Sequence, residues 1–147
     1  AKDSSLRYVV VGSGPLEQIL KDIVRSRGLD RIVKFVGFTP REQLPPYLWA
    51  ADIFLFTTIC VEGLPLNLLE GLAAGLPCIV SDHVSNADWG TVGVSPNKVD
   101  TIASEIIRLS AGSRCDRHSR LPDQYSLDIA AKKYITLFDR LIRDGSK

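Results

Sequence analysis

The sequence predicts an α/β fold in which helices cover both faces of a mostly parallel sheet, a three-layer α/β/α arrangement. Short β-branched runs alternate with longer segments whose apolar residues recur at helical spacing, and this alternation is typical of parallel sheets. The chain has 147 residues, 45% hydrophobic and 24% charged, which suits one folded domain. We therefore expect a single domain over residues 1–147.

The first strand-helix unit is expected at the start of the chain. Leu6 to Val11 is an apolar run of strand length, and the glycine-rich turn Gly12 to Pro15 follows it. Apolar residues then recur at helical spacing up to Gly28. We expect the helix to end there, because glycine readily takes the positive φ that ends many helices. The turn lacks the third glycine of a G-x-G-x-x-G motif, so we interpret it as a packing feature.

The second and third strands are expected from two further apolar runs. Ile32 to Val36 predicts a strand that ends in the loop Gly37 to Pro40. A short helix should follow with the pair Pro45-Pro46 in its first turn, where a missing N–H costs little. Ile53 to Phe56 predicts the next strand, and its loop runs from Thr57 to Gly63.

The remaining elements are three helices and a strand, with one segment that the pattern does not resolve. A helix is expected to begin near Pro65, and Cys78 to Ser81 predicts the fourth strand. From Asp82 to Asn97 the pattern is weak and indicates a loop, in which it favours a short strand only at Thr91 to Val94. Two more amphipathic helices are expected, around Ile102–Leu109 and Ile129–Leu141, separated by the polar tract 111–123.

Composition excludes several classes of function. Eighteen Lys and Arg balance seventeen Asp and Glu, giving a net charge of +1, so nothing favours nucleic acid. The odd number of cysteines, three, argues against a disulfide scaffold. No leader peptide or transmembrane stretch is recognisable. We expect a cytoplasmic protein, or one held at the inner face of the membrane as part of a longer chain.

The carboxyl ends of the strands are where a parallel sheet binds ligands, and two carboxylates occur there. Glu62 lies in the loop after the third strand, and Glu70 lies eight residues later on the following helix. Eight residues of continuous helix would turn them about 80° apart, so they converge only if Glu62 belongs to the loop and Glu70 to the second turn. Between them a helix N-terminus offers the amides of Gly63, Leu64, Leu66 and Asn67 to an anion.

This stretch resembles a known signature. The run E-G-L-P-L-N-L-L-E-G-L-A-A-G-L-P-C-I-V-S, from Glu62 to Ser81, is similar to the E-x(7)-E motif of retaining nucleotide-sugar glycosyltransferases of the GT-B fold. The segments V-V-V-G-S-G-P, V-K-F-V-G-F and Y-L-W-A-A-D-I-F-L-F resemble the donor-binding domain of the same family, in the same order. The resemblance implies a Rossmann-like domain that forms one half of a GT-B architecture.

The resemblance also implies roles for individual residues. Glu62 would contact hydroxyls of the donor sugar as the catalytic residue, and Glu70 would bind the nucleotide ribose. The amides of Gly63, Leu64, Leu66 and Asn67 would hold sugar and diphosphate. Gly37 and Thr39, after the second strand, would meet the base, often uracil. The implied activity is transfer of a hexose from a UDP-sugar to a polysaccharide or glycolipid, as in capsular or exopolysaccharide synthesis.

Relatives of this kind suggest that the 147-residue chain is only part of the working enzyme. Their first donor-domain strand and helix, with two phosphate-binding basic residues, would precede Leu6, and their acceptor domain is absent here. We therefore expect donor binding without transfer by the chain alone. The alternatives are a non-catalytic nucleotide-binding or interaction module, and half of a GT-B-type UDP-sugar epimerase.

Metal and partner expectations follow from the same residues. No D-x-D sequence occurs and no His or Cys spacing suggests zinc, so we expect no metal and no cofactor beyond the UDP-sugar substrate. The last helix would leave apolar surface exposed, which predicts homodimerisation. His83 could reach the ligand edge, although a lone loop histidine is more often a surface residue. Trp89 could equally cover the donor or lie idle on the surface.

Overall fold

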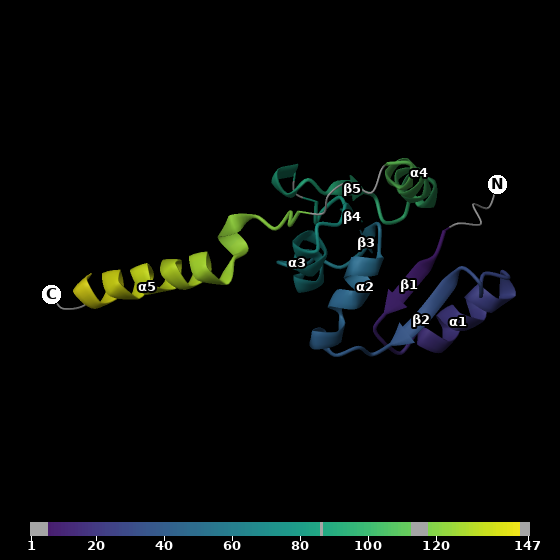
Figure 1. Cartoon of the computed structure of the whole chain (residues 1–147), viewed down its shortest axis with the longest axis horizontal. Coiled ribbons are helices and arrows are strands. Elements are labelled where there is room, and N and C mark those ends of the chain that lie inside the picture. The colour runs from purple at the N-terminus through teal and green to yellow at the C-terminus, as the bar shows by residue number, and fades with distance from the viewer. Residues whose placement is uncertain (1–5, 86, 113–117, 145–147) are drawn as a thin grey trace. The chain divides into compact units, whose positions relative to one another are not determined.

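The computed structural model describes residues 6–85, 87–112 and 118–144 and divides into two compact units, Ala1–Pro46 and Tyr47–Lys147. Both units contain parallel strands, and in each of them a helix connects one strand to the next (Figure 1). The α/β class and the parallel pairing expected from the sequence are thus confirmed. The strands form two sheets, one in each unit, and each unit is described separately below.

The first unit is a strand-helix-strand crossover. Strands β1 (Tyr8–Val11) and β2 (Val33–Gly37) pair in parallel, with Tyr8 opposite Val33, and helix α1 (Glu17–Ser26) connects them. Gly28 follows α1 with φ 62°, and the N–H of Leu29 reaches back to the Val24 carbonyl. This is the glycine-terminated helix end that the sequence predicted.

The loop after β2 leads into a helix that begins with two prolines. A 3-10 turn, η1 (Arg41–Gln43), precedes helix α2 (Pro45–Ala50). The pair Pro45-Pro46 therefore occupies the first turn of α2, where neither residue removes a hydrogen bond within the helix, as expected.

The second unit contains a three-stranded parallel sheet in the order β3-β4-β5. Strand β3 (Phe54–Phe56) pairs with β4 (Cys78–Ser81), and β4 pairs with β5 (Val92–Val94). Helix α3 (Leu66–Ala73) connects β3 to β4. The register sets Phe54 opposite Cys78 and Ile79 opposite Val92, which places the loops after all three strands at one edge of the sheet.

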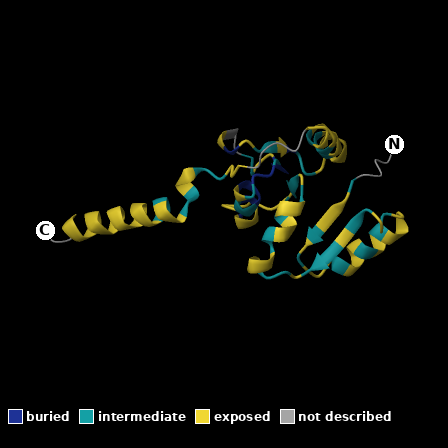
Figure 2. Ribbon diagram, in the orientation of Figure 1, coloured by how far each residue is buried: buried dark blue, intermediate teal, exposed yellow. Residues whose placement is uncertain are grey.

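The core of the second unit lies between α3 and the central strand. Every residue of β4 is buried, which fits a strand covered on both faces (Figure 2). The fully buried hydrophobic side chains come from α3, from the turn after it and from β4: Leu68, Leu72, Leu76, Cys78, Ile79 and Val80. Packing of α3 on β4 removes these side chains from water. Each fully buried leucine, isoleucine or valine side chain contributes roughly 1.5–3 kcal/mol of favourable free energy to folding.

Trp89 belongs to this core, so neither of the two roles expected for it was correct. It lies in the 3-10 turn η2 (Ala87–Trp89), is 9% exposed, and packs with Leu68, Leu72 and Val80. Its ring meets that of Tyr125 edge to face, with centroids 5.4 Å apart. The sequence pattern missed it because η2 has neither helical nor strand period.

Two helices complete the second unit. Helix α4 (Val99–Ser110) follows β5, and the 3-10 turn η3 (Asp123–Tyr125) precedes α5 (Leu127–Asp144). Large apolar side chains along α5 are exposed (Figure 2). Among the described residues, no helix has the length and apolar character that crossing a membrane requires.

Candidate functional site

The loops after β3 and β4 form the candidate site. Parallel pairing brings the carboxyl ends of these strands to one edge, so the loop 57–65 after β3 begins beside Ser81, the last residue of β4. The tightest contact between them involves Ser81, whose side chain is fully buried. Its hydroxyl accepts a hydrogen bond from the Thr58 N–H and donates one to the Thr58 carbonyl, both at 2.7 Å.

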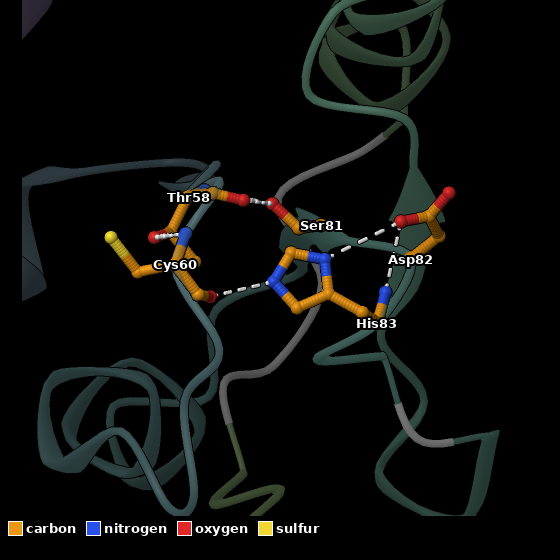
Figure 3. A network of polar contacts seen from close by, with 5 residues as sticks. All are labelled: Thr58, Cys60, Ser81, Asp82 and His83. Carbon is orange, nitrogen blue, oxygen red and sulfur yellow. Dashed lines mark hydrogen bonds and ion pairs between the residues drawn. The ribbon is translucent and has the colours of Figure 1, made fainter.

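A second set of contacts continues the attachment along the loop (Figure 3). The Cys60 N–H donates to the Thr58 hydroxyl at 3.0 Å, and the Cys60 carbonyl lies 2.9 Å from Nε2 of His83. His83 in turn contacts Asp82, whose carboxylate accepts the His83 backbone N–H at 2.9 Å and lies 3.6 Å from Nδ1. The loop is therefore fixed up to two residues before Glu62.

Glu62 itself is in the loop, as the sequence predicted. Its side chain is exposed, and so are Gly63 and Leu64 after it. Buried Pro65 then leads into α3, which begins at Leu66. The carboxylate of Glu62 thus stands on an accessible segment immediately before a helix N-terminus.

The N-terminus of α3 presents free backbone donors. The first N–H groups of a helix have no acceptor within it. Within the described part of the chain, the N–H groups of Leu66 and Asn67 have no acceptor, whereas that of Leu68 reaches the Pro65 carbonyl at 3.1 Å. The Asn67 side-chain oxygen also accepts the Leu68 N–H at 2.9 Å. Such an end attracts an anion through its amides and its dipole.

Glu70 lies in the second turn of α3, being the fifth residue of the helix, and it is partly buried. The prediction that one carboxylate belongs to the loop and the other to the second turn is therefore met by the secondary structure. Convergence of the two carboxylates on one ligand stays a prediction.

Gly37 and Thr39 belong to the first unit, at the carboxyl end of β2. Gly37 has φ 84°, a value that favours glycine, and its carbonyl accepts the Gly12 N–H at 2.8 Å. The Thr39 hydroxyl donates weakly to the same carbonyl, at 3.4 Å. These contacts join the turn after β1 to the loop after β2, and the role of both residues toward a base stays a prediction.

The cysteines and acidic groups do not gather into a metal site in the part of the chain that is described, where no three His, Cys, Asp or Glu side chains cluster. Cys78 is buried in β4, which raises the pKa of its thiol to about 12 despite the opposing effect of nearby Arg120. Cys60 is exposed in the loop. The absence of a metal requirement stays a prediction.

Sequence reasoning missed the part played by Ser81 and set aside that of His83. Ser81 ends an apolar strand. A buried hydroxyl at that position needs a hydrogen-bond partner, and this need is the signal that Ser81 bonds to the backbone of a neighbouring segment. His83 has no pattern around it that indicates a partner. Only the strand pairing brings it to Cys60, a residue 23 positions earlier.

Comparisons with known proteins show the family and the fold. Residues 1–111 match the family model described as "Glycosyl transferases group 1". The amylovoran biosynthesis glycosyltransferase AmsK of Erwinia amylovora is 29% identical over 150 residues, covering 91% of this chain and 37% of AmsK.

Two solved structures have a similar fold. The lipopolysaccharide outer core galactosyltransferase WaaB, in its apo form, matches with a TM-score of 0.69 and 20% identity over 92% of this chain and 41% of WaaB. HepE of Anabaena, crystallised in complex with UDP, matches with a TM-score of 0.65 and 17% identity over 97% of this chain and 41% of HepE. The chain therefore spans about two fifths of the proteins that it matches.

Proposed function

Because the chain belongs to the group 1 glycosyltransferases, we propose that it binds a UDP-sugar as the donor half of a retaining hexosyltransferase. The acceptor would be a polysaccharide or glycolipid. The name of AmsK, an amylovoran biosynthesis glycosyltransferase, supports this choice. The complex of HepE with UDP supports the choice of nucleotide. The enzyme would work in the cytoplasm, as part of a longer protein that supplies the acceptor domain.

The observation that carries this proposal is the arrangement around the N-terminus of α3. Glu62 stands in the exposed loop before the helix, free amides of Leu66 and Asn67 begin it, and Glu70 follows in its second turn. An anion-binding helix end flanked by two hydrogen-bond acceptors suits a ligand that joins a diphosphate to hydroxyl-rich groups.

Each part of the ligand is assigned to a part of the site. The diphosphate would lie against the amides of Gly63, Leu64, Leu66 and Asn67, where backbone N–H groups favour negative charge. The sugar hydroxyls would donate to Glu62 and the ribose hydroxyls to Glu70.

The reaction follows from this placement. The bond between the anomeric carbon and the diphosphate oxygen breaks, and UDP leaves with both electrons. The acceptor hydroxyl oxygen forms the new bond to the anomeric carbon and gives up its proton to the departing diphosphate oxygen. Positioned amide dipoles stabilise the charge that develops on the leaving diphosphate, work that does not require a metal.

Calorimetric titration of the chain with UDP tests the site directly. We expect Glu70→Ala to weaken UDP binding about 10- to 100-fold, because a hydrogen bond to a charged group contributes about 1.5–3 kcal/mol. Glu105→Ala on α4 is the matched control, since it removes one carboxylate from another helix, and its affinity should equal that of the wild type.

Two results would contradict the proposal. One is a folded wild-type chain that binds neither UDP nor any UDP-sugar. The other is equal affinity of the Glu70→Ala variant and the wild type, which would show that the nucleotide does not use this site.

A further inference from the structure

The contact between His83 and the Cys60 carbonyl joins the loop after β4 to the loop that carries Glu62 (Figure 3). A carbonyl oxygen only accepts hydrogen bonds, so Nε2 of His83 must carry the proton and donate it. Both the imidazolium and the Nε2–H tautomer meet this requirement. The contact at 2.9 Å is a hydrogen bond of ordinary length.

Apolar burial does little to hold the loop at this point. The side chains of Ile59 and Val61, on either side of Cys60, are 78% and 97% exposed. Ordering a backbone residue costs roughly 1–2 kcal/mol, so this exposed part of the loop depends on its polar contacts. Both backbone polar groups of Cys60 have a partner. The Cys60 N–H donates to the Thr58 hydroxyl, and the Cys60 carbonyl accepts from His83.

Asp82 holds the imidazole in turn. Its carboxylate accepts the backbone N–H of His83 at 2.9 Å and faces Nδ1 at 3.6 Å. The carboxylate thus lies beside Nδ1 while Nε2 faces the Cys60 carbonyl, so both nitrogens of the ring lie close to a polar group (Figure 3). Asp82 is itself fixed by β5, because its N–H donates to the Val94 carbonyl at 2.9 Å.

We propose that His83 is a positioning residue for the donor sugar, which holds the loop so that Glu62 can meet the sugar hydroxyls. The inference rests on the proposed function. His83 touches neither the nucleotide nor the sugar in this scheme and acts through Cys60, two residues before Glu62. It should therefore affect binding of the sugar far more than binding of UDP, because UDP keeps Glu70 and the amides of Leu66 and Asn67, which belong to α3 and not to the loop.

The test compares UDP with a panel of UDP-glucose, UDP-galactose and UDP-N-acetylglucosamine by calorimetry. We expect His83→Leu, which cannot donate, to weaken the best-bound UDP-sugar about three- to tenfold and to change UDP affinity less than twofold. His83→Gln keeps an N–H donor on a side chain of similar reach and should restore most of the affinity. In a Glu62→Ala background, His83→Leu should have no further effect on the sugar.

The outcomes separate the two proposals. Equal loss of UDP and UDP-sugar affinity in His83→Leu, or equal weakness of His83→Leu and His83→Gln, would overturn the positioning role. Unchanged UDP-sugar binding in His83→Leu would overturn it as well. Failure of the wild-type chain to bind UDP would instead overturn the proposed function.

Discussion

Cys78 and Cys60 show how strongly position decides the chemistry of one residue type. Cys78 is 1% exposed in β4, and its thiol donates to the Leu76 carbonyl at 3.3 Å, whereas Cys60 is exposed in the loop before Glu62. Burial raises the pKa of Cys78 from 9.0 to about 12, because the thiolate would lose its hydration. The folded protein therefore keeps a thiol at Cys78 under conditions in which the unfolded chain ionises it.

This difference predicts how stability depends on pH. Unfolded Cys78 releases its proton near pH 9, but folded Cys78 does so only near pH 12, so its contribution to stability is complete below pH 9 and is lost between pH 9 and 12. Between pH 8 and pH 10 the wild type should lose about 1 kcal/mol more unfolding free energy than Cys78→Ala. Urea unfolding at the two pH values measures this loss.

Cys60→Ala is the control for that experiment, because it removes an exposed thiol and should keep the wild-type pH dependence. Equal losses in the wild type and Cys78→Ala would show that the buried thiol does not contribute.

At the scale of elements, helix α3 depends on its close approach to strand β3. A Cβ built on Gly71 would lie 2.8 Å from Cγ of Phe54, closer than real side-chain contacts allow. Gly71 is buried within α3, between Glu70 of the candidate site and Leu72 of the core. The glycine lets the helix that carries Glu70 pack directly on the aromatic ring of the strand.

Replacing this glycine should reverse the usual effect of alanine in a helix. Alanine normally stabilises a helix interior by about 0.8–1 kcal/mol relative to glycine. In Gly71→Ala the overlap with Phe54 should outweigh that gain and lower the unfolding free energy by about 1–3 kcal/mol. Chemical denaturation monitored by circular dichroism provides the measurement.

Gly14→Ala serves as the comparison, since no atom lies within 4 Å of the Cβ it would add and its φ is not in the left-handed region. It should be at least as stable as the wild type. A Gly71→Ala variant of wild-type stability would mean that α3 and β3 can separate without cost.

At the scale of the whole molecule, helix α5 exposes a series of large apolar side chains. Its exposed large side chains are Leu127, Tyr134, Ile135, Leu137, Phe138, Leu141 and Ile142. Tyr134 and Phe138 stack on each other, with ring centroids 6.3 Å apart. Apolar surface of this kind favours association, and the homodimer expected from the sequence stays a prediction.

Sedimentation velocity at increasing concentration tests that dimer. The wild type should associate, and Phe138→Glu should shift it toward monomer by placing a charge in the apolar face. Thr136→Glu adds the same charge about 200° around the helix, on the opposite side, and should associate like the wild type. A wild-type chain that stays monomeric at the highest concentration would exclude this role for α5.

The sequence by itself determined the order of strands and helices and the place of both glutamates. Alternating apolar periods locate β1 to β4, and Gly28 and the pair Pro45-Pro46 mark helix boundaries, because these signals act within a few residues. The motif from Glu62 to Ser81 likewise carried the family, since its spacing is fixed by one loop and one helix.

Only the tertiary structure decided which distant residues act together. Trp89 enters the core and His83 reaches the Cys60 carbonyl because strand pairing sets separate loops side by side, and no local period records such contacts. Ser81 reads in the sequence as the end of an apolar strand, yet its hydroxyl fixes Thr58 across the sheet. Secondary structure follows from neighbours along the chain, whereas the geometry of the loop that carries Glu62 follows from hydrogen bonds across 23 residues.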